Sequence, residues 1–188
     1  MSGAHGHGHV EGDNKKIALL IAVLALFLAL AETMAKGAQT NALSYNVEAS
    51  NLWAFFQAKT IRQTVVRTAG EMADIAHNGD EAAADTIAKQ TDAWAKTVAR
   101  WESEPETGEG RKELVARAKA AEEKRSTAMA KYHHYEVSSA AFQIAIVLAS
   151  ATVITGAMVL TWLSIGLGVV GLIFAGIGLL APHAVHLF

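Results

Sequence analysis

The first apolar block of the chain predicts a membrane-spanning helix near the N-terminus. Residues 17–31 contain no charged residue and no helix breaker. With their neighbours they predict a transmembrane helix over 15–35, because a crossing needs about 20 mostly apolar residues. Lys15 and Lys16 before the block, and the small-residue ending at Ala29–Ala31, also describe a cleavable signal peptide. Of these two alternatives we expect a retained anchor, preceded by a flexible tail over 1–14.

A second apolar block lies near the C-terminus and is uncharged to the end of the chain. It covers roughly residues 137–181, about twice the length that one crossing requires. This length predicts a hairpin of two transmembrane helices, 137–160 and 162–181, followed by a short tail over 182–188. We expect the turn near Gly156 to Ser164, where Trp162 can lie at the level of the lipid headgroups.

The polar segment between the two blocks, residues 36–136, predicts an extramembrane helical hairpin. Three helical stretches are expected, over 36–77, 80–102 and 111–136. Asn78–Gly79 can end the first stretch and Asp80 can cap the second, while the linker 103–110 contains proline and glycines that oppose helix. The third stretch has no breaker before the second apolar block and should continue into it.

The first stretch shows a seam of small and apolar residues at the spacing of a coiled coil. Most steps along it alternate between four and three residues, the repeat that keeps one helix face toward a partner. Its members are Val47, Ala54, Ala58, Ile61, Val65, Thr68, Met72 and Ile75. We expect the returning helices to cover this seam, with Ile87, Thr91, Trp94, Val98 and Trp101 facing it from the second stretch. Leu114, Ala118, Ala121, Ala128, Tyr132 and Tyr135 would face it from the third.

A second apolar ridge lies beside that seam. It consists of Leu52, Phe55 and Phe56, with the adjacent Trp53. Exposure of such large apolar side chains to water is unfavourable, and one hairpin partner cannot cover both the seam and this ridge. We therefore predict that these four residues form an interface with another subunit or a partner. A local three-helix packing with Trp94 and Trp101 is the alternative.

Small residues also recur along the last predicted transmembrane helix. The sequence places Ser164, Gly168, Gly171, Ala175 and Gly178 at steps of four and three, which allows helix backbones to approach closely in lipid. The preceding helix carries a matching series at Ala145, Ala149, Thr152 and Gly156. The two series can face each other within one chain, or can also make contacts between subunits.

Composition excludes several classes of chemistry. The chain has no cysteine, so disulfides and thiolate chemistry are absent, and a net charge of −2 gives no reason to expect nucleic acid. No nucleophile elbow, phosphate-binding loop or zinc-protease motif occurs. Glu102, Glu104, Glu106 and Glu109 are expected to be a solvated acidic linker. We predict neither enzymatic activity nor a cofactor.

Histidines supply the candidate metal ligands. His5, His7 and His9 alternate in the N-terminal tail, a spacing that can bind zinc, copper or nickel, although a solvated tail is the alternative. His133 and His134 precede the second apolar block, where polar aromatic residues suit a membrane interface. Glu32 follows the first block, where we expect it to reach the surface with Lys36 as its partner.

Two segments carry a resemblance to a known family. The run Glu48–Ile61, including Trp53–Ala54–Phe55–Phe56–Gln57–Ala58–Lys59, and the later His133–His134–Tyr135–Glu136 and Phe142–Gln143–Ile144–Ala145 resemble an uncharacterised bacterial family of small membrane proteins, a domain of unknown function. The resemblance implies an anchor helix, a coiled region, a closing membrane hairpin and a bacterial membrane. It implies no activity and no catalytic residue.

Together the patterns predict an all-α integral membrane protein with three transmembrane helices and an extramembrane, coiled-coil-like hairpin. The expected function is that of a membrane-anchored scaffold or accessory protein that forms a homo-oligomer or binds a neighbouring membrane complex. The alternative is a sensor that binds a ligand or metal through the hairpin or the histidine tail. We expect the lipid bilayer of a bacterial inner membrane around the anchors, the N-terminal tail inside and the hairpin in the periplasm.

Overall fold

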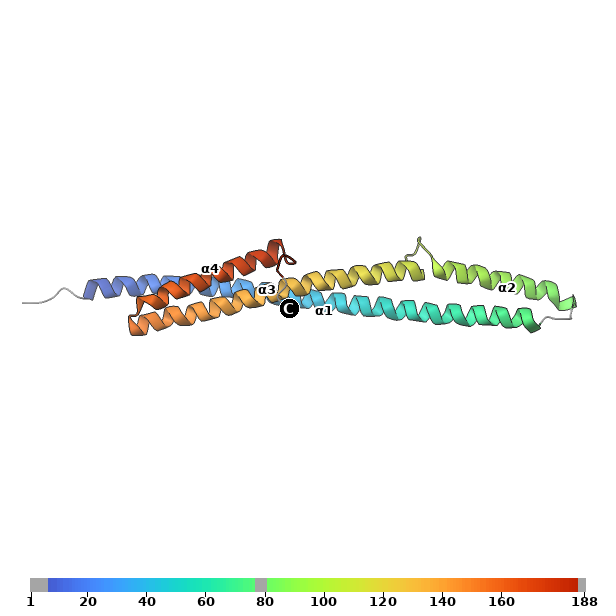
Figure 1. Ribbon diagram of the computed structural model, residues 1–188, viewed down its shortest axis with the longest axis horizontal. Helices are drawn as coiled ribbons and strands as arrows, with labels where there is room; N and C mark the ends of the chain where they lie inside the picture. Colours follow the sequence, from blue (N-terminus) through green and yellow to red (C-terminus); the bar gives the residue numbers. More distant parts are fainter. Residues whose placement is uncertain (1–6, 77–80, 186–188) are drawn as a thin grey trace, which may run out of the picture. The chain divides into compact units, whose positions relative to one another are not determined.

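The computed structural model describes residues 7–76 and 81–185, with side chains from residues 14–76 and 84–185. These ranges form four helices and no strand (Figure 1). The helices are α1 (His7–Ala76), α2 (Glu81–Glu102), α3 (Arg111–Thr155) and α4 (Met158–Leu180). The turn expected at Asn78–Gly79 and the cap at Asp80 lie outside the described residues.

Helix breaks occur where the chain has proline or glycine. The linker after α2 contains Pro105 and Gly108, whose φ of 66° is in the left-handed region that favours glycine. Gly156, with φ of 69°, separates α3 from α4, at the beginning of the range where the sequence predicted a turn. No break interrupts α3, which confirms that the third helical stretch continues into the second apolar block. Trp162 lies in the first turns of α4, and its position at the level of the lipid headgroups stays a prediction.

Three helices are long and apolar enough to cross a membrane. They are α1, α3 and α4, each with an apolar segment in the region that the sequence assigned to a crossing. The all-α class and the three membrane-competent helices are therefore as predicted.

The chain divides into two compact units, to both of which α1 and α3 contribute, and each is described here by itself. Unit 1 contains the described residues of Met1–Ala42 and Ser126–Phe188. Within it α4 lies along the C-terminal half of α3, as Figure 1 shows, and α1 completes a three-helix pack. Leu24, Ala31, Phe142 and Ala145 form the buried core, and the rings of Phe27 and Phe142 stack with centroids 5.9 Å apart.

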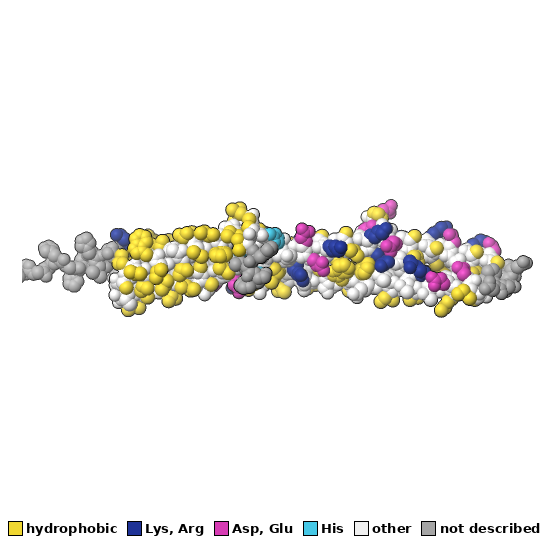
Figure 2. Space-filling view, viewed as in Figure 1, with side chains coloured by type: hydrophobic (Ala, Val, Ile, Leu, Met, Phe, Trp, Pro, Cys, Tyr) yellow, Lys and Arg dark blue, Asp and Glu magenta, His cyan; other side chains and the backbone are white. Residues whose placement is uncertain are grey.

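The outer surface of unit 1 is apolar. Large aliphatic side chains point away from the core on all three helices, among them Leu19, Val147 and Leu180, which are 67%, 65% and 83% exposed. Figure 2 shows hydrophobic side chains covering the visible face of this unit, whereas lysine, arginine and acidic side chains gather on unit 2. An apolar exterior around a small-residue core is typical of a helix bundle in lipid.

Unit 2, Leu43–Arg125, is an antiparallel helical hairpin with one interrupted leg. Its core cluster contains Ala49, Leu52, Leu114, Ala118 and Ala121. The second leg begins with α2, which lies beside the C-terminal part of α1 (Figure 1), and continues in the first half of α3. The predicted inner face of the third helical stretch is buried at Leu114, Ala118 and Ala121 in unit 2, and at Ala128 and Tyr135 in unit 1.

The predicted seam of α1 is wrong, because it is the face of the helix that the hairpin leaves uncovered. Val47, Ile61, Val65, Met72 and Ile75 are 58–71% exposed. The returning leg instead covers the opposite face, with Ala49, Leu52, Lys59 and Gln63 buried. The physical reason lies on the facing helix, where the small residues Ala118 and Ala121 of α3 leave room for Leu52 and the aromatic side chains beside it.

Candidate functional site

The aromatic ridge of α1 packs inside unit 2. Trp53, Phe55 and Phe56 lie against the cluster that contains Leu52 and Leu114. The rings of Trp53 and Phe56 meet edge to face, with centroids 5.7 Å apart, and Trp53 Nε1 donates a hydrogen bond of 2.8 Å to Glu122 Oε1. Leu52 is thus buried within the chain and Trp53, Phe55 and Phe56 are partly buried there; their predicted contact with another subunit stays a prediction.

The exposed face of α1 becomes the main candidate interaction surface. We call it the α1 stripe, and it contains the eight seam residues Val47, Ala54, Ala58, Ile61, Val65, Thr68, Met72 and Ile75. All eight are exposed and none is charged. Isolated exposed aliphatic residues are ordinary, but a continuous row of them marks a surface that another apolar surface can cover.

A second feature of unit 2 is a network of polar side chains where α1, the linker and the start of α3 meet. We call it the polar junction, and its main residues are Lys59, Gln63, Glu102, Glu104 and Arg111. Arg111 Nη1 donates to Gln63 Oε1 at 2.6 Å and to Glu102 Oε2 at 2.8 Å, and Arg111 Nε donates to Thr60 Oγ1 at 3.1 Å. Lys59, which is 5% exposed, forms an ion pair with Glu104 at 3.8 Å.

The charges of the polar junction satisfy one another. Buried cations need partners, and here Lys59 and Arg111 each have a carboxylate and also lie over an aromatic face, 5.2 Å from the Phe55 centroid and 5.1 Å from the Phe56 centroid. These pairs hold the linker against α1. The view of Glu102 and Glu104 as solvated linker charges is corrected, because both are half-buried and paired.

Glu113 fixes the other side of the linker. Its carboxylate accepts a hydrogen bond of 2.7 Å from the Ser103 hydroxyl and one of 3.1 Å from the Glu104 backbone N–H. These donors favour the ionised form and lower the pKa of Glu113 from its usual 4.5. Gly110 packs closely against the start of the linker. A Cβ added at this position would lie 2.7 Å from the Cα of Ser103, so the observed packing requires glycine here.

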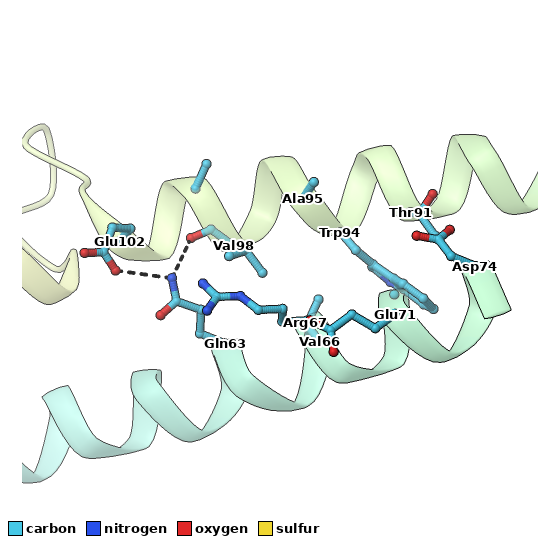
Figure 3. A pocket seen from close by; sticks show the side chains of 12 residues that line it. Gln63, Val66, Arg67, Glu71, Asp74, Thr91, Trp94, Ala95, Val98 and Glu102 are labelled. Carbon is cyan, nitrogen blue, oxygen red and sulfur yellow. Dashed lines mark hydrogen bonds between the residues drawn. The ribbon is translucent and has the colours of Figure 1, made fainter.

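A groove of about 440 Å³ runs between α1 and α2 (Figure 3). The Trp94 ring lies between the two helices, and a Cβ added at Gly70 would be 4.0 Å from it. Gln63 donates to the carbonyl of Val98 at 3.2 Å at one end of the groove. Arg67, Glu71 and Asp74 along its edge carry both signs of charge. With Glu102, which also lines the groove, the lining has three acidic side chains and one basic one.

In unit 1 the small residues of α4 make contacts within the chain. Ser164 Oγ donates to the carbonyl of Ala145 at 2.7 Å, and added Cβ atoms at Gly168, Gly171 and Gly178 would lie 2.8–2.9 Å from side chains of α1 and α3. Ala175 is half-buried on the same helix. The small residues of α4 therefore pack against helices of the same chain, which is the first of the two alternatives that the sequence left open.

The candidate histidines of the N-terminal tail lie outside the described part of the chain, whereas those near the second apolar block lie within it. His5 lies outside the described residues, and so do the side chains of His7 and His9. His134 is buried, and its Nε2 lies 3.1 Å from the carbonyl oxygen of Pro182, while His183 Nε2 lies 3.0 Å from Thr127 Oγ1. Among the described residues no three histidine, aspartate or glutamate side chains are grouped to hold a metal ion.

Glu32 has a different partner from the one expected. Gln143 Nε2 of α3 donates to Glu32 Oε1 at 3.2 Å, so the contact joins two helices rather than two turns of α1. Sequence spacing could suggest Lys36 as the partner, but it gives no information about a residue 111 positions away.

Sequence reasoning missed the polar junction. The usable signal was on α1, where Ala49, Leu52, Phe56, Lys59 and Gln63 follow one another at steps of three and four. A lysine and a glutamine that continue an apolar ridge must be paired if the ridge is buried. The partners could not be identified, because Arg111 lies 48 residues from Gln63.

Comparison with known proteins gives a family and no activity. No curated protein and no solved structure matches the chain. One family model matches residues 13–181, a range that includes the three apolar segments, the α1 stripe and the polar junction. The chain therefore belongs to the family described as Domain of unknown function (DUF4337).

Proposed function

We propose that this protein is a non-enzymatic scaffold or accessory protein, held in the membrane by unit 1, that self-associates or binds a neighbouring membrane complex through unit 2. The observation that carries the proposal is the α1 stripe, a row of uncharged residues on a helix whose opposite face already forms the core of the hairpin. The apolar exterior of unit 1 supports the anchor, since such a surface is stable in lipid.

The proposed location is the inner membrane of a bacterium, with the N-terminal tail inside the cell and unit 2 in the periplasm. Lys15 and Lys16 precede the first apolar segment, and basic residues next to a crossing favour the cytoplasmic side. Single cysteines in this cysteine-free chain test the topology with a maleimide that does not cross membranes. Glu106→Cys should react in intact spheroplasts and Ser2→Cys only after lysis; the reverse pattern refutes the orientation.

Association is tested on the full chain in mild detergent and in lipid nanodiscs by native mass spectrometry. The proposal expects a species heavier than one chain of 19.9 kDa, either a multiple of that mass or a complex with a second membrane protein. A single chain in nanodiscs, together with no crosslinked product in membranes, would refute it.

A ligand-binding accessory role is the second candidate, supported by the groove between α1 and α2. Its Trp94 ring offers an aromatic face between the two helices. Native mass spectrometry also tests this role, because a retained small molecule would appear as a mass increment. Trp94→Ala should remove that increment if the groove holds the molecule.

A further inference from the structure

The α1 stripe has the spacing of one side of a two-helix coiled coil. From Ala54 to Ile75 its steps are four, three, four, three, four and three. This repeat keeps the same face of a helix toward a partner over many turns, with each side chain entering a gap on the facing helix. The hairpin leaves this face open, because its own second leg covers the opposite side of α1.

We propose that the occupant of the α1 stripe is the α1 stripe of a second copy of this chain, packed parallel and in register. This inference rests on the proposed function and names its partner. Every copy inserted in one membrane with the same topology leaves the bilayer along α1 in the same chain direction. Two neighbouring copies therefore present their stripes in parallel, and confinement to the membrane raises their effective concentration.

The charge pattern is compatible with this symmetric pairing. In a parallel in-register pair each residue of the seam meets its own counterpart, so a charged residue on the seam would meet a like charge. The stripe has none between Val47 and Ile75. On its flanks, heptad geometry places Arg62 opposite Gln57 of the second copy and Glu71 opposite Ala76, so the flanks bring no like charges together.

The size of the stripe fits a weak interface that an anchored protein can use. With the exposed Leu43 at one end and Ile75 at the other, the row spans about 33 residues, or ~50 Å at 1.5 Å per residue. A strip ~10 Å wide gives roughly 500 Å² on each copy and roughly 1,000 Å² in total, the lower limit for a specific interface. Association in a membrane requires less intrinsic affinity than association in solution.

Disulfide crosslinking in membranes tests the inference, because the chain has no cysteine of its own. Val65→Cys and Met72→Cys are made separately in the full chain and oxidised. Both should form a disulfide-linked dimer, since an in-register parallel pair brings each position to its own counterpart. Gln90→Cys, exposed on α2, is the matched control and should give about tenfold less dimer, as expected for random collisions.

A second variant measures association without crosslinking. Val65→Glu places two carboxylates opposite each other in the proposed pair and should shift the nanodisc mass to that of one chain, with unchanged helicity by circular dichroism. Gln90→Glu adds the same charge to α2 and should leave the mass unchanged. If Val65→Glu lowers helicity, the crosslinking result decides.

The outcomes separate this inference from the proposed function. A multimer that forms no dimer at Val65→Cys and Met72→Cys overturns the parallel stripe contact while association itself stands. A disulfide at only one of the two positions indicates a shifted or antiparallel pair and also overturns it. A complex of one copy with a different protein assigns the stripe to that partner, and a single chain in nanodiscs and in membranes refutes both proposals.

Discussion

The contact between Gly171 and Phe142 gives the sharpest test of packing in unit 1. Gly171 is buried on α4, and an added Cβ would lie 2.8 Å from Cε1 and 2.9 Å from Cζ of the Phe142 ring. Phe142 is only 1% exposed and belongs to the core, so its ring has little room to move. Gly171→Ala should therefore force a shift of packed groups, although it adds a single methyl group.

The same helix provides a matched control. A Cβ added at Gly176 meets nothing within 4 Å. Alanine is favoured over glycine inside a helix by about 0.8–1 kcal/mol, and both substitutions receive this contribution. Gly176→Ala should leave stability unchanged or raised, whereas overpacking at Gly171 costs about 1–3 kcal/mol. For a chain of this size the difference corresponds to roughly 2–12 °C in the midpoint of thermal unfolding.

The assay is thermal unfolding of the full chain in one mild detergent, followed by the loss of helical circular dichroism. A third variant, Gly171→Ala combined with Phe142→Leu, should lose less than the sum of the two single losses, because the smaller side chain makes room for the methyl group. Equal midpoints for Gly171→Ala and Gly176→Ala, or strictly additive losses in the double variant, would refute the assignment of this contact.

Three further predictions concern unit 2, each read as the thermal midpoint of the full chain. Leu114→Ala removes a side chain with no exposed surface and should lower the free energy of unfolding by about 2–5 kcal/mol. Ile61→Ala on the exposed stripe should lower it by less than about 0.5 kcal/mol, measured in a detergent in which the chain is monomeric. Gly110→Ala should destabilise the hairpin by about 1–3 kcal/mol, because the added Cβ would meet the backbone of Ser103. Gly37→Ala is the control and should not destabilise the protein, because a Cβ added there meets nothing within 4 Å. The pKa of Glu113 is lower in the folded protein than its usual 4.5, so the ionised carboxylate stabilises the folded state. This stabilisation is complete above pH 4.5 and is lost as the pH falls through the pKa of the folded state. Glu113→Gln should therefore be less stable than the parent at pH 7, and the difference should shrink as the pH falls below 4.5; a constant difference would show that the carboxylate charge is not involved.

Helix positions were predictable because local chemistry determines them. The acidic linker with Pro105, the continuity from Arg111 into the apolar block and the break at Gly156 all follow from residues within a few positions of each other. The buried face of α3 was predictable for a similar reason. One side of that helix carries Leu114, Ala118 and Ala121, and the other carries charges.

The buried face of α1 was not predictable from spacing, because both of its sides are apolar in unit 2. A repeat of four and three is present at Ala54–Ile75 and also at Ala49–Gln63, so periodicity alone gives two answers. The choice depends on the shape of the partner, where alanines of α3 accept the rings of Phe55 and Phe56. The polar junction was not predictable either, because its hydrogen bonds to α1 join residues 39–51 positions apart.

The separation along the chain of the contacts in unit 1 sets an order for its assembly during synthesis. α3 and α4 meet through pairs as close as nine residues, Thr152 with Thr161, so this hairpin can close as soon as it emerges. α1 reaches its partner only when Gln143 is made, 111 residues after Glu32. In the proposed membrane location, and at a synthesis rate of about 5–20 residues per second, the first helix waits roughly 6–22 s in the bilayer before Gln143 is made. During that time residues 17–31 have no helix to pack against and must be stable in lipid by themselves. Their lack of charged residues meets this requirement, which ends once the three helices have packed.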